Sequence, residues 1–124
     1  MSELLIYAAS IVITIWGVAH IIATKSVVAG FGAVSPDNRR IITMEWIGEG
    51  LALCFIGVLV ALVTILDEPT TQATFTVYLA SAVMLLVMAG LTATTGARTS
   101  ILPMKLCPWV KTAAAVLIIV AISL

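Results

Sequence analysis

The chain has 124 residues, of which 62% are hydrophobic and only 10% are charged. Soluble domains usually carry about a quarter of charged residues, and a chain this short could not bury so much apolar surface in water. Six basic and six acidic side chains give a formal net charge of zero, which argues against a nucleic-acid partner, since such a partner requires a basic face. We therefore expect one membrane domain, with the lipid bilayer as its main partner.

Four apolar runs follow one another along the chain, and each predicts a transmembrane helix. The predicted helices cover residues 4–24, 37–66, 72–95 and 104–123. About 20 apolar residues span the hydrocarbon core, and backbone groups in lipid must be paired within the segment, which favours helices. The predicted fold class is therefore all-α, a four-helix up-down transmembrane bundle that occupies residues 1–124 as a single domain.

The first connection is unusual because it is apolar but broken by glycines. Residues 26–34 read "SVVAGFGAV" and are too few to cross a membrane. One interpretation is an interfacial segment that lies on the end of the bundle. The other is a re-entrant flap that covers a site.

The helix boundaries carry recognisable capping residues. Ser35 is a suitable N-cap for the second helix, with Pro36 at its first helical position. Thr70 or Thr71 can cap the third helix. The fourth helix is predicted to begin at or just after Pro103, because proline is tolerated in the first turn.

The charges predict an orientation in the membrane. Acidic residues occupy the N-terminus and the second connection, whereas every basic residue flanks the first or third connection; these are Lys25, Arg39, Arg40, Arg98, Lys105 and Lys111. The positive-inside rule places this basic side in the cytoplasm. The prediction is a multi-pass protein of the cell (inner) membrane with both termini outside.

Three ionisable side chains fall inside the apolar runs at similar depth. His20 lies about 6 Å, Glu45 about 6 Å and Glu49 about 12 Å from the cytoplasmic ends of their runs, at about 1.5 Å per residue. Glu45 and Glu49 are one turn apart and share a helix face, and Trp46 adjoins them. Because ionisable groups in lipid usually face the bundle interior, we expect these side chains to meet. Arg98 at the inner end of the third helix could reach Glu45.

The same constellation admits three interpretations. A pocket that binds a ligand or handles protons would use His20, Glu45 and Glu49 as polar contacts. A hydrogen-bonded knot that only fixes the helix register would use the same groups. A metal site is the third, because three protein ligands suffice for a catalytic metal, although the paired histidines of most di-iron bundles are absent.

Several stretches resemble one known family. Residues 16–20, "WGVAH", residues 45–62, "EWIGEGLALCFIGVLVAL", and residues 102–120, "LPMKLCPWVKTAAAVLIIV", resemble the DoxX-like group of small four-helix membrane proteins. That group recurrently has a glycine and a polar residue late in helix one and a glutamate before a glycine-rich stretch in helix two. The matching residues here are Gly17, His20, Glu45 or Glu49, and Gly50 or Gly57. The resemblance implies links to respiratory quinone chemistry, redox homeostasis or receptor assembly.

The leading functional prediction is a small membrane protein that binds a hydrophobic or amphipathic ligand, quinone or lipid-like, in a cytoplasm-facing pocket. His20, Glu45, Glu49 and Arg98 would contact its polar part and Trp46 its apolar part, and proton-coupled movement is an extension. We expect a homo-oligomer or a partner membrane subunit, because four helices alone offer little room for a transport path. One alternative is an accessory or assembly subunit with a structural polar cluster. Another is a membrane enzyme that uses a glutamate as acid or base. The sequence does not identify a cofactor.

Overall fold

The computed structural model describes all 124 residues and consists of helices and connections without a strand. The elements are α1 (Glu3–Ile22), α2 (Thr24–Gly30), α3 (Pro36–Leu66), α4 (Gln72–Thr94), the 3-10 helix η1 (Gly96–Arg98) and α5 (Leu102–Ser123). All the α-helices except α2 are long and apolar enough to cross a membrane. The predicted all-α four-helix bundle is confirmed, and the chain is a small multi-pass membrane protein.

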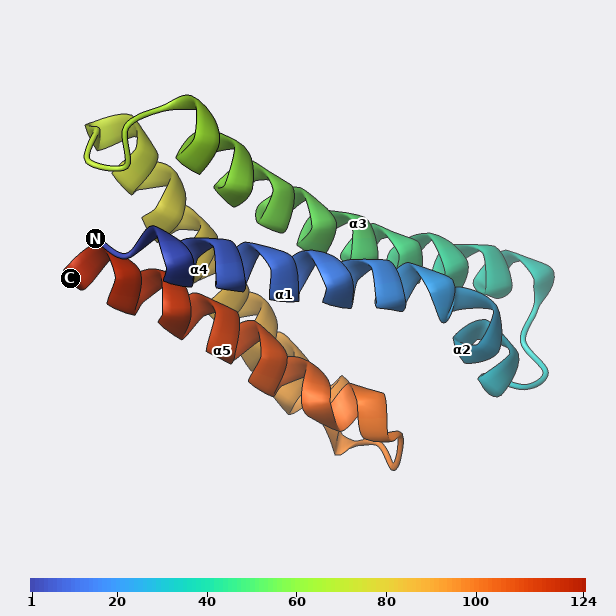
Figure 1. The fold of residues 1–124 in the computed structure, drawn as a ribbon. Helices are drawn as coiled ribbons and strands as arrows, with labels where there is room; N and C mark the ends of the chain where they lie inside the picture. Colours follow the sequence, from blue (N-terminus) through green and yellow to red (C-terminus); the bar gives the residue numbers. More distant parts are fainter.

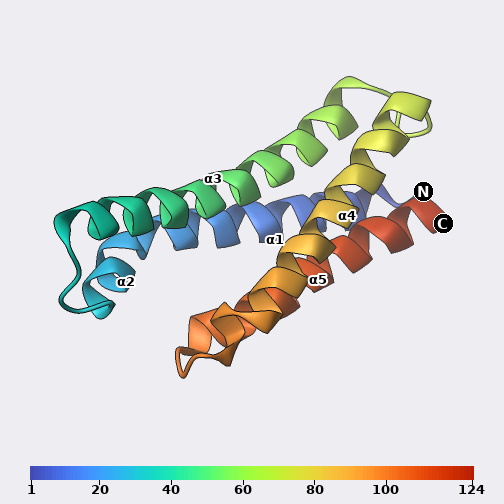
Figure 2. The same ribbon diagram turned by 180° about the vertical axis from the view of Figure 1, so that it is seen from behind.

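The four long helices form two antiparallel pairs (Figure 1). α1 packs along α3, α4 packs along α5, and α1 also contacts α5, so that the two pairs meet mainly through α1 and α5. The two chain ends meet, and the Ser2 N–H donates to the Ala121 carbonyl over 3.2 Å. From that end the pairs diverge toward the end that carries α2 and η1 (Figure 2). We call these the terminal end and the α2 end of the bundle.

The caps that start α3 and α4 are the ones that the sequence predicts. Ser35 Oγ accepts a hydrogen bond from the Asn38 N–H over 3.2 Å. Thr71 Oγ1 likewise accepts from the Thr74 N–H over 3.2 Å. α5 begins at Leu102, two residues earlier than predicted, with proline in its first turn, where a missing N–H costs nothing.

The turn between α3 and α4 is organised by one carboxylate. Asp67 Oδ2 accepts from the Thr71 hydroxyl and, over 2.7 Å, from the Thr74 hydroxyl, while its Oδ1 accepts from the Glu68 N–H over 2.9 Å. These hydrogen bonds hold the pKa of Asp67 below its usual range, and the one from Thr71 has the largest effect. The charged form of this side chain therefore supports the turn.

The first connection contains a short helix that the sequence did not predict. α2 turns at the end of α1 and lies against the α2 end of the bundle, with Val28 buried. Gly32, at φ 72°, then turns the chain toward Ser35 in a conformation that other residues rarely adopt. The segment therefore packs against α1 and α3 at this end of the bundle.

Glycines bring α1 and α3 into direct backbone contact. A Cβ on Gly17 would lie 2.7 Å from the Gly50 carbonyl oxygen and 2.8 Å from the Cys54 nitrogen. A Cβ on Gly57 would lie 2.8 Å from the Ser10 carbonyl oxygen, and Ser10 Oγ donates to the Gly57 carbonyl over 2.6 Å. Small residues of this kind allow close helix approach in lipid, where a hydrophobic driving force between helices is missing.

The apolar core occupies the half of the bundle near the terminal end. Its buried members are Ile6, Ala9, Ile13, Leu53, Ile56, Val60, Tyr78, Ala82, Leu85, Ala114, Ala115, Ile118 and Ala121. The α2 end contributes no residue to this core. Ionisable and large aromatic side chains fill the bundle there instead.

Candidate functional site

Glu49 lies at the centre of a polar cluster to which all four long helices contribute. Its Oε1 accepts a hydrogen bond from Lys111 Nζ of α5, and its Oε2 lies 3.5 Å from His20 Nε2 of α1. Lys111 Nζ also donates to Thr92 Oγ1 of α4 over 2.8 Å. We call His20, Glu49, Thr92 and Lys111 the polar cluster.

Lys111 is the most deeply placed charge of the protein. Its side chain is 0% exposed, whereas that of Glu49 is 30% exposed and that of His20 is 5% exposed. An ammonium group in a low-dielectric interior is tolerated only with a close counter-charge and satisfied hydrogen bonds. The Glu49 carboxylate supplies the charge and the Thr92 hydroxyl supplies a second acceptor, so the pair is neutral as a unit.

Two tryptophans, Trp46 and Trp16, lie close to the polar cluster, and Trp46 packs against the His20 imidazole. The rings of Trp46 and His20 stack, with centroids 3.9 Å apart and an interplanar angle of 12°. Trp46 Nε1 also donates to the His20 carbonyl over 2.7 Å, so that α3 holds the end of α1 at two points. On the other side, Trp16 Nε1 donates to Cys107 Sγ over 3.3 Å. His20 Nε2 itself is buried and has no hydrogen-bond partner.

A cleft of about 540 Å³ opens between α3 and α4 beside the polar cluster. Its lining comprises Phe31, Ile41, Ile42, Glu45, Trp46, Gly48, Glu49, Met88, Leu91, Thr92, Thr95, Gly96 and Met104. Glu45 and Glu49 of α3 both line it, and no lysine or arginine does. The cleft therefore combines a largely apolar wall with two carboxylates and two threonine hydroxyls.

The structure brings together part of the predicted constellation. His20, Trp46 and Glu49 are in mutual contact, as the depth argument predicts. Glu45 lines the cleft but is exposed and takes part in no ion pair. The suggested contact of Arg98 with Glu45 is wrong, because η1 leaves Arg98 exposed and without an ion pair, outside the cleft lining.

The metal interpretation has no ligand set in this structure. No group of three or more histidine, cysteine, aspartate or glutamate side chains lies close enough to hold a metal ion. Glu45 is one turn from Glu49 along α3 and both line the cleft, but only Glu49 also reaches α1 and α5, through His20 and Lys111. Both cysteines are free thiols.

Lys111 is the residue that the sequence interpretation missed. It was counted among the cations that flank the third connection, whereas it lies inside α5 and is buried. A signal was available, because Lys111 follows Pro103 by eight residues and so lies about 12 Å into the helix at 1.5 Å per residue. That is the depth inferred for Glu49, and a cation at the same depth is its natural partner.

Comparisons with protein-family models, with curated proteins and with solved structures found no match to this chain.

Proposed function

We propose that this membrane protein binds an amphipathic ligand, quinone or lipid-like, in the cleft between α3 and α4. The observation that carries the proposal is the position of Glu49. Its carboxylate is anchored from behind by the buried Lys111 and is partly exposed on the cleft side. A charge held so firmly at the wall of a cavity is arranged for contact with a polar group inside it.

The cleft has the size and chemistry that such a ligand needs. Its volume of about 540 Å³ falls within the roughly 300–1,000 Å³ of small-molecule sites. Met88, Leu91 and Ile41 offer an apolar wall for a ring or chain, and Thr92 and Thr95 add hydroxyls next to the carboxylates. The polar part of the ligand is expected at Glu49 and Glu45.

Coupling to protons is an extension of this proposal. His20 Nε2 is 3.5 Å from Glu49 Oε2, and an imidazole is the side chain whose charge most readily changes near neutral pH. A proton taken up by this pair changes the charge next to the cleft by one unit. Ligand binding and proton uptake at the pair are then linked, because each alters the free energy of the other.

The orientation in the membrane and the relationship to the DoxX-like group also belong to the proposal. Five exposed cations still lie at the α2 end after Lys111 is removed from the count; they are Lys25, Arg39, Arg40, Arg98 and Lys105. By the positive-inside rule this end, with the cleft, faces the cytoplasm and both termini face outward. Kinship with the DoxX-like group and assembly into a homo-oligomer remain predictions.

A second candidate function is favoured by the same cluster. Lys111 joins α5 to α3 through Glu49 and to α4 through Thr92, and this linkage holds the two helix pairs together where they diverge. A cluster with only this role fits an accessory or assembly subunit of a larger membrane complex, whose partners would cover the exposed helix faces.

Native mass spectrometry of protein extracted gently from its own membrane separates the two candidates. Glu45→Gln is the informative variant, because Glu45 lines the cleft and makes no ion pair, so the fold should survive. The proposal expects a co-purifying small molecule that Glu45→Gln loses. Glu68→Gln, a change of an exposed glutamate at the terminal end, is the control and should retain the molecule.

Two other results, one from this measurement and one from an activity assay, would contradict the proposal. A partner subunit that co-purifies with the wild type and both variants, with no small molecule, favours the assembly role. Turnover of a lipid-like substrate by purified protein, lost in Glu49→Gln at unchanged helix content, favours the enzyme alternative.

A further inference from the structure

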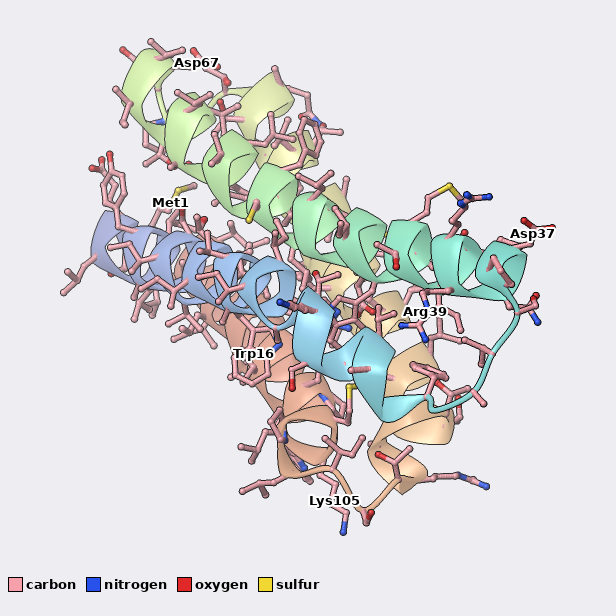
Figure 3. The ribbon with its side chains drawn as sticks, turned by 90° about the vertical axis from the view of Figure 1, so that its right-hand side faces the viewer. Met1, Trp16, Asp37, Arg39, Asp67 and Lys105 are labelled. Carbon is pink, nitrogen blue, oxygen red and sulfur yellow. The ribbon has the colours of Figure 1, made fainter.

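A second cavity, of about 480 Å³, lies at the α2 end on the other side of Trp46. It is lined by Trp16, Ala19, His20, Ala23, Ser26, Val27, Trp46, Ile101, Leu102, Pro103, Met104, Leu106 and Cys107. These residues come from α1, α2, α3 and the beginning of α5, and Figure 3 shows Trp16 between α1 and α5 beside α2. Trp46 and Met104 line both this cavity and the cleft, so their side chains separate the two.

The second cavity differs from the cleft in having no carboxylate in its lining. No aspartate, glutamate, lysine or arginine contributes to it, although Lys25 and Lys105 adjoin lining residues in the sequence and are exposed. A charged head group placed inside would leave water without meeting a counter-charge, which costs several kcal/mol on the order of a buried unpaired ion. The lining itself therefore favours a neutral ligand over an ionised one.

The hydrogen-bonding capacity of the lining is small and concentrated in one place. Cys107 Sγ is already occupied by Trp16 Nε1. His20 Nε2 is buried without a hydrogen-bond partner, and the exposed Ser26 lies at the edge near α2. Because one polar group in a buried site needs one partner, the lining matches a ligand with a single neutral hydrogen-bonding group.

We infer that the second cavity binds a neutral single-chain amphiphile with one hydrogen-bonding group, such as a long-chain alcohol. Its chain lies among Trp16, Leu102 and Leu106, and its hydroxyl or carbonyl group lies on the side of His20 and Ser26. The inference does not rest on the ligand of the cleft, because the cleft presents two carboxylates and the second cavity presents none.

Tryptophan fluorescence tests this site directly. In a Trp109→Phe variant the remaining tryptophans, Trp16 and Trp46, both line the cavity, whereas Trp109 is 74% exposed on the outside. The variant is placed in zwitterionic lipid vesicles and titrated with a long-chain alcohol that bears a quenching bromine at its tail. The same chain with a trimethylammonium or a sulfate head serves as the charged comparison.

The inference expects saturable quenching by the alcohol. The charged probes should need a concentration at least about tenfold higher, which corresponds to about 1.4 kcal/mol. Ala19→Phe, which fills the cavity from an exposed position on α1, should weaken the alcohol about tenfold by the same conversion. Ala23→Leu fills the cavity from another position and serves if the first variant loses helix content.

Matched variants keep this test separate from the cleft. Ala29→Phe adds the same bulk to an exposed position of α2 outside the lining and should leave the alcohol titration unchanged. Glu45→Gln should also leave it unchanged, even if it removes the ligand of the cleft. Quenching that rises linearly without saturation, or that is equal for all three probes, or that both filling variants leave intact, would overturn the inference.

Discussion

The ion pair between Lys111 and Glu49 predicts an unequal response to loss of either partner. In Glu49→Gln the ammonium of Lys111, which is 0% exposed, loses its counter-charge and keeps only neutral acceptors, the introduced amide oxygen and the Thr92 hydroxyl. Removal of one partner from a buried pair typically costs about 3–5 kcal/mol, because the other charge is left uncompensated. We expect Glu49→Gln to destabilise the bundle by an amount in this range.

Lys111→Met should cost less than Glu49→Gln. The carboxylate that remains is 30% exposed, so water and the nearby His20 can replace part of what the ammonium supplied. The loss is then close to that of a hydrogen bond to a charged group, about 1.5–3 kcal/mol. The double variant Lys111→Met/Glu49→Gln removes both charges and is expected to be more stable than Glu49→Gln alone.

Unfolding in mixed micelles with increasing SDS, followed by circular dichroism, measures these free energies. The two single variants and the double variant form a thermodynamic cycle, and residues in contact should give an interaction energy of about 0.5–3 kcal/mol. The reasoning is refuted if Lys111→Met costs as much as Glu49→Gln, since the difference in exposure would then have no consequence. Strictly additive effects would refute it as well, because they would mean that the two charges do not interact.

Three further predictions concern other parts of the molecule. Gly17→Ala should destabilise the bundle by about 1–3 kcal/mol in the same assay, because its Cβ meets backbone atoms of α3 at 2.7–2.8 Å; Gly90→Ala, with nothing within 4 Å, should be neutral or stabilising by up to about 1 kcal/mol. The lowered pKa of Asp67 means that its stabilising effect is complete above the ordinary value of 3.8 and is lost as the pH falls through the lower folded-state pKa. Thermal unfolding between neutral and acidic pH should show this loss in the wild type and not in Asp67→Asn. In intact cells an impermeant maleimide should label Glu68→Cys and not Lys25→Cys in a background without other cysteines, if the α2 end faces the cytoplasm.

Each of these three has an outcome that contradicts it. Equal stability of the two glycine variants would mean that the contact between α1 and α3 adjusts without cost. A wild type whose acid dependence matches that of Asp67→Asn would mean that the turn does not depend on the carboxylate. Labelling of Lys25→Cys in sealed cells would reverse the proposed orientation.

The helices and the depth of the site were predictable because lipid imposes them. A segment that crosses hydrocarbon must be helical and about 20 residues long, so apolar runs and capping residues locate it. The fixed rise per residue then converts positions into depths, which is why His20 and Glu49 could be placed together. None of this depends on how the helices pack.

The partners within the site were less predictable because they depend on rotation about each helix axis. Lys111 and Arg98 are both basic residues near the third connection, but α5 turns Lys111 into the bundle while η1 leaves Arg98 exposed. Glu45 and Glu49 share a face of α3 and both line the cleft, but only Glu49 has His20 and Lys111 within reach. The depth of a residue in the membrane depends on its own helix alone. The direction in which its side chain points depends on how the helix is rotated against its neighbours, and a single sequence carries little information on that rotation.

The position of both cavities follows from the sizes of the side chains along the helices. Toward the terminal end, α1 and α5 face each other through small residues such as Ala9 and Ala114, each 0% exposed, and the pairs stay close. Toward the α2 end the corresponding space is taken by Trp16, Trp46 and Met104, which are too large for close approach, so the pairs diverge. Bulky side chains that hold helices apart leave gaps between themselves, and here the gaps adjoin the only buried charges. The residues that make room for a ligand are therefore also those that shield the polar cluster from lipid.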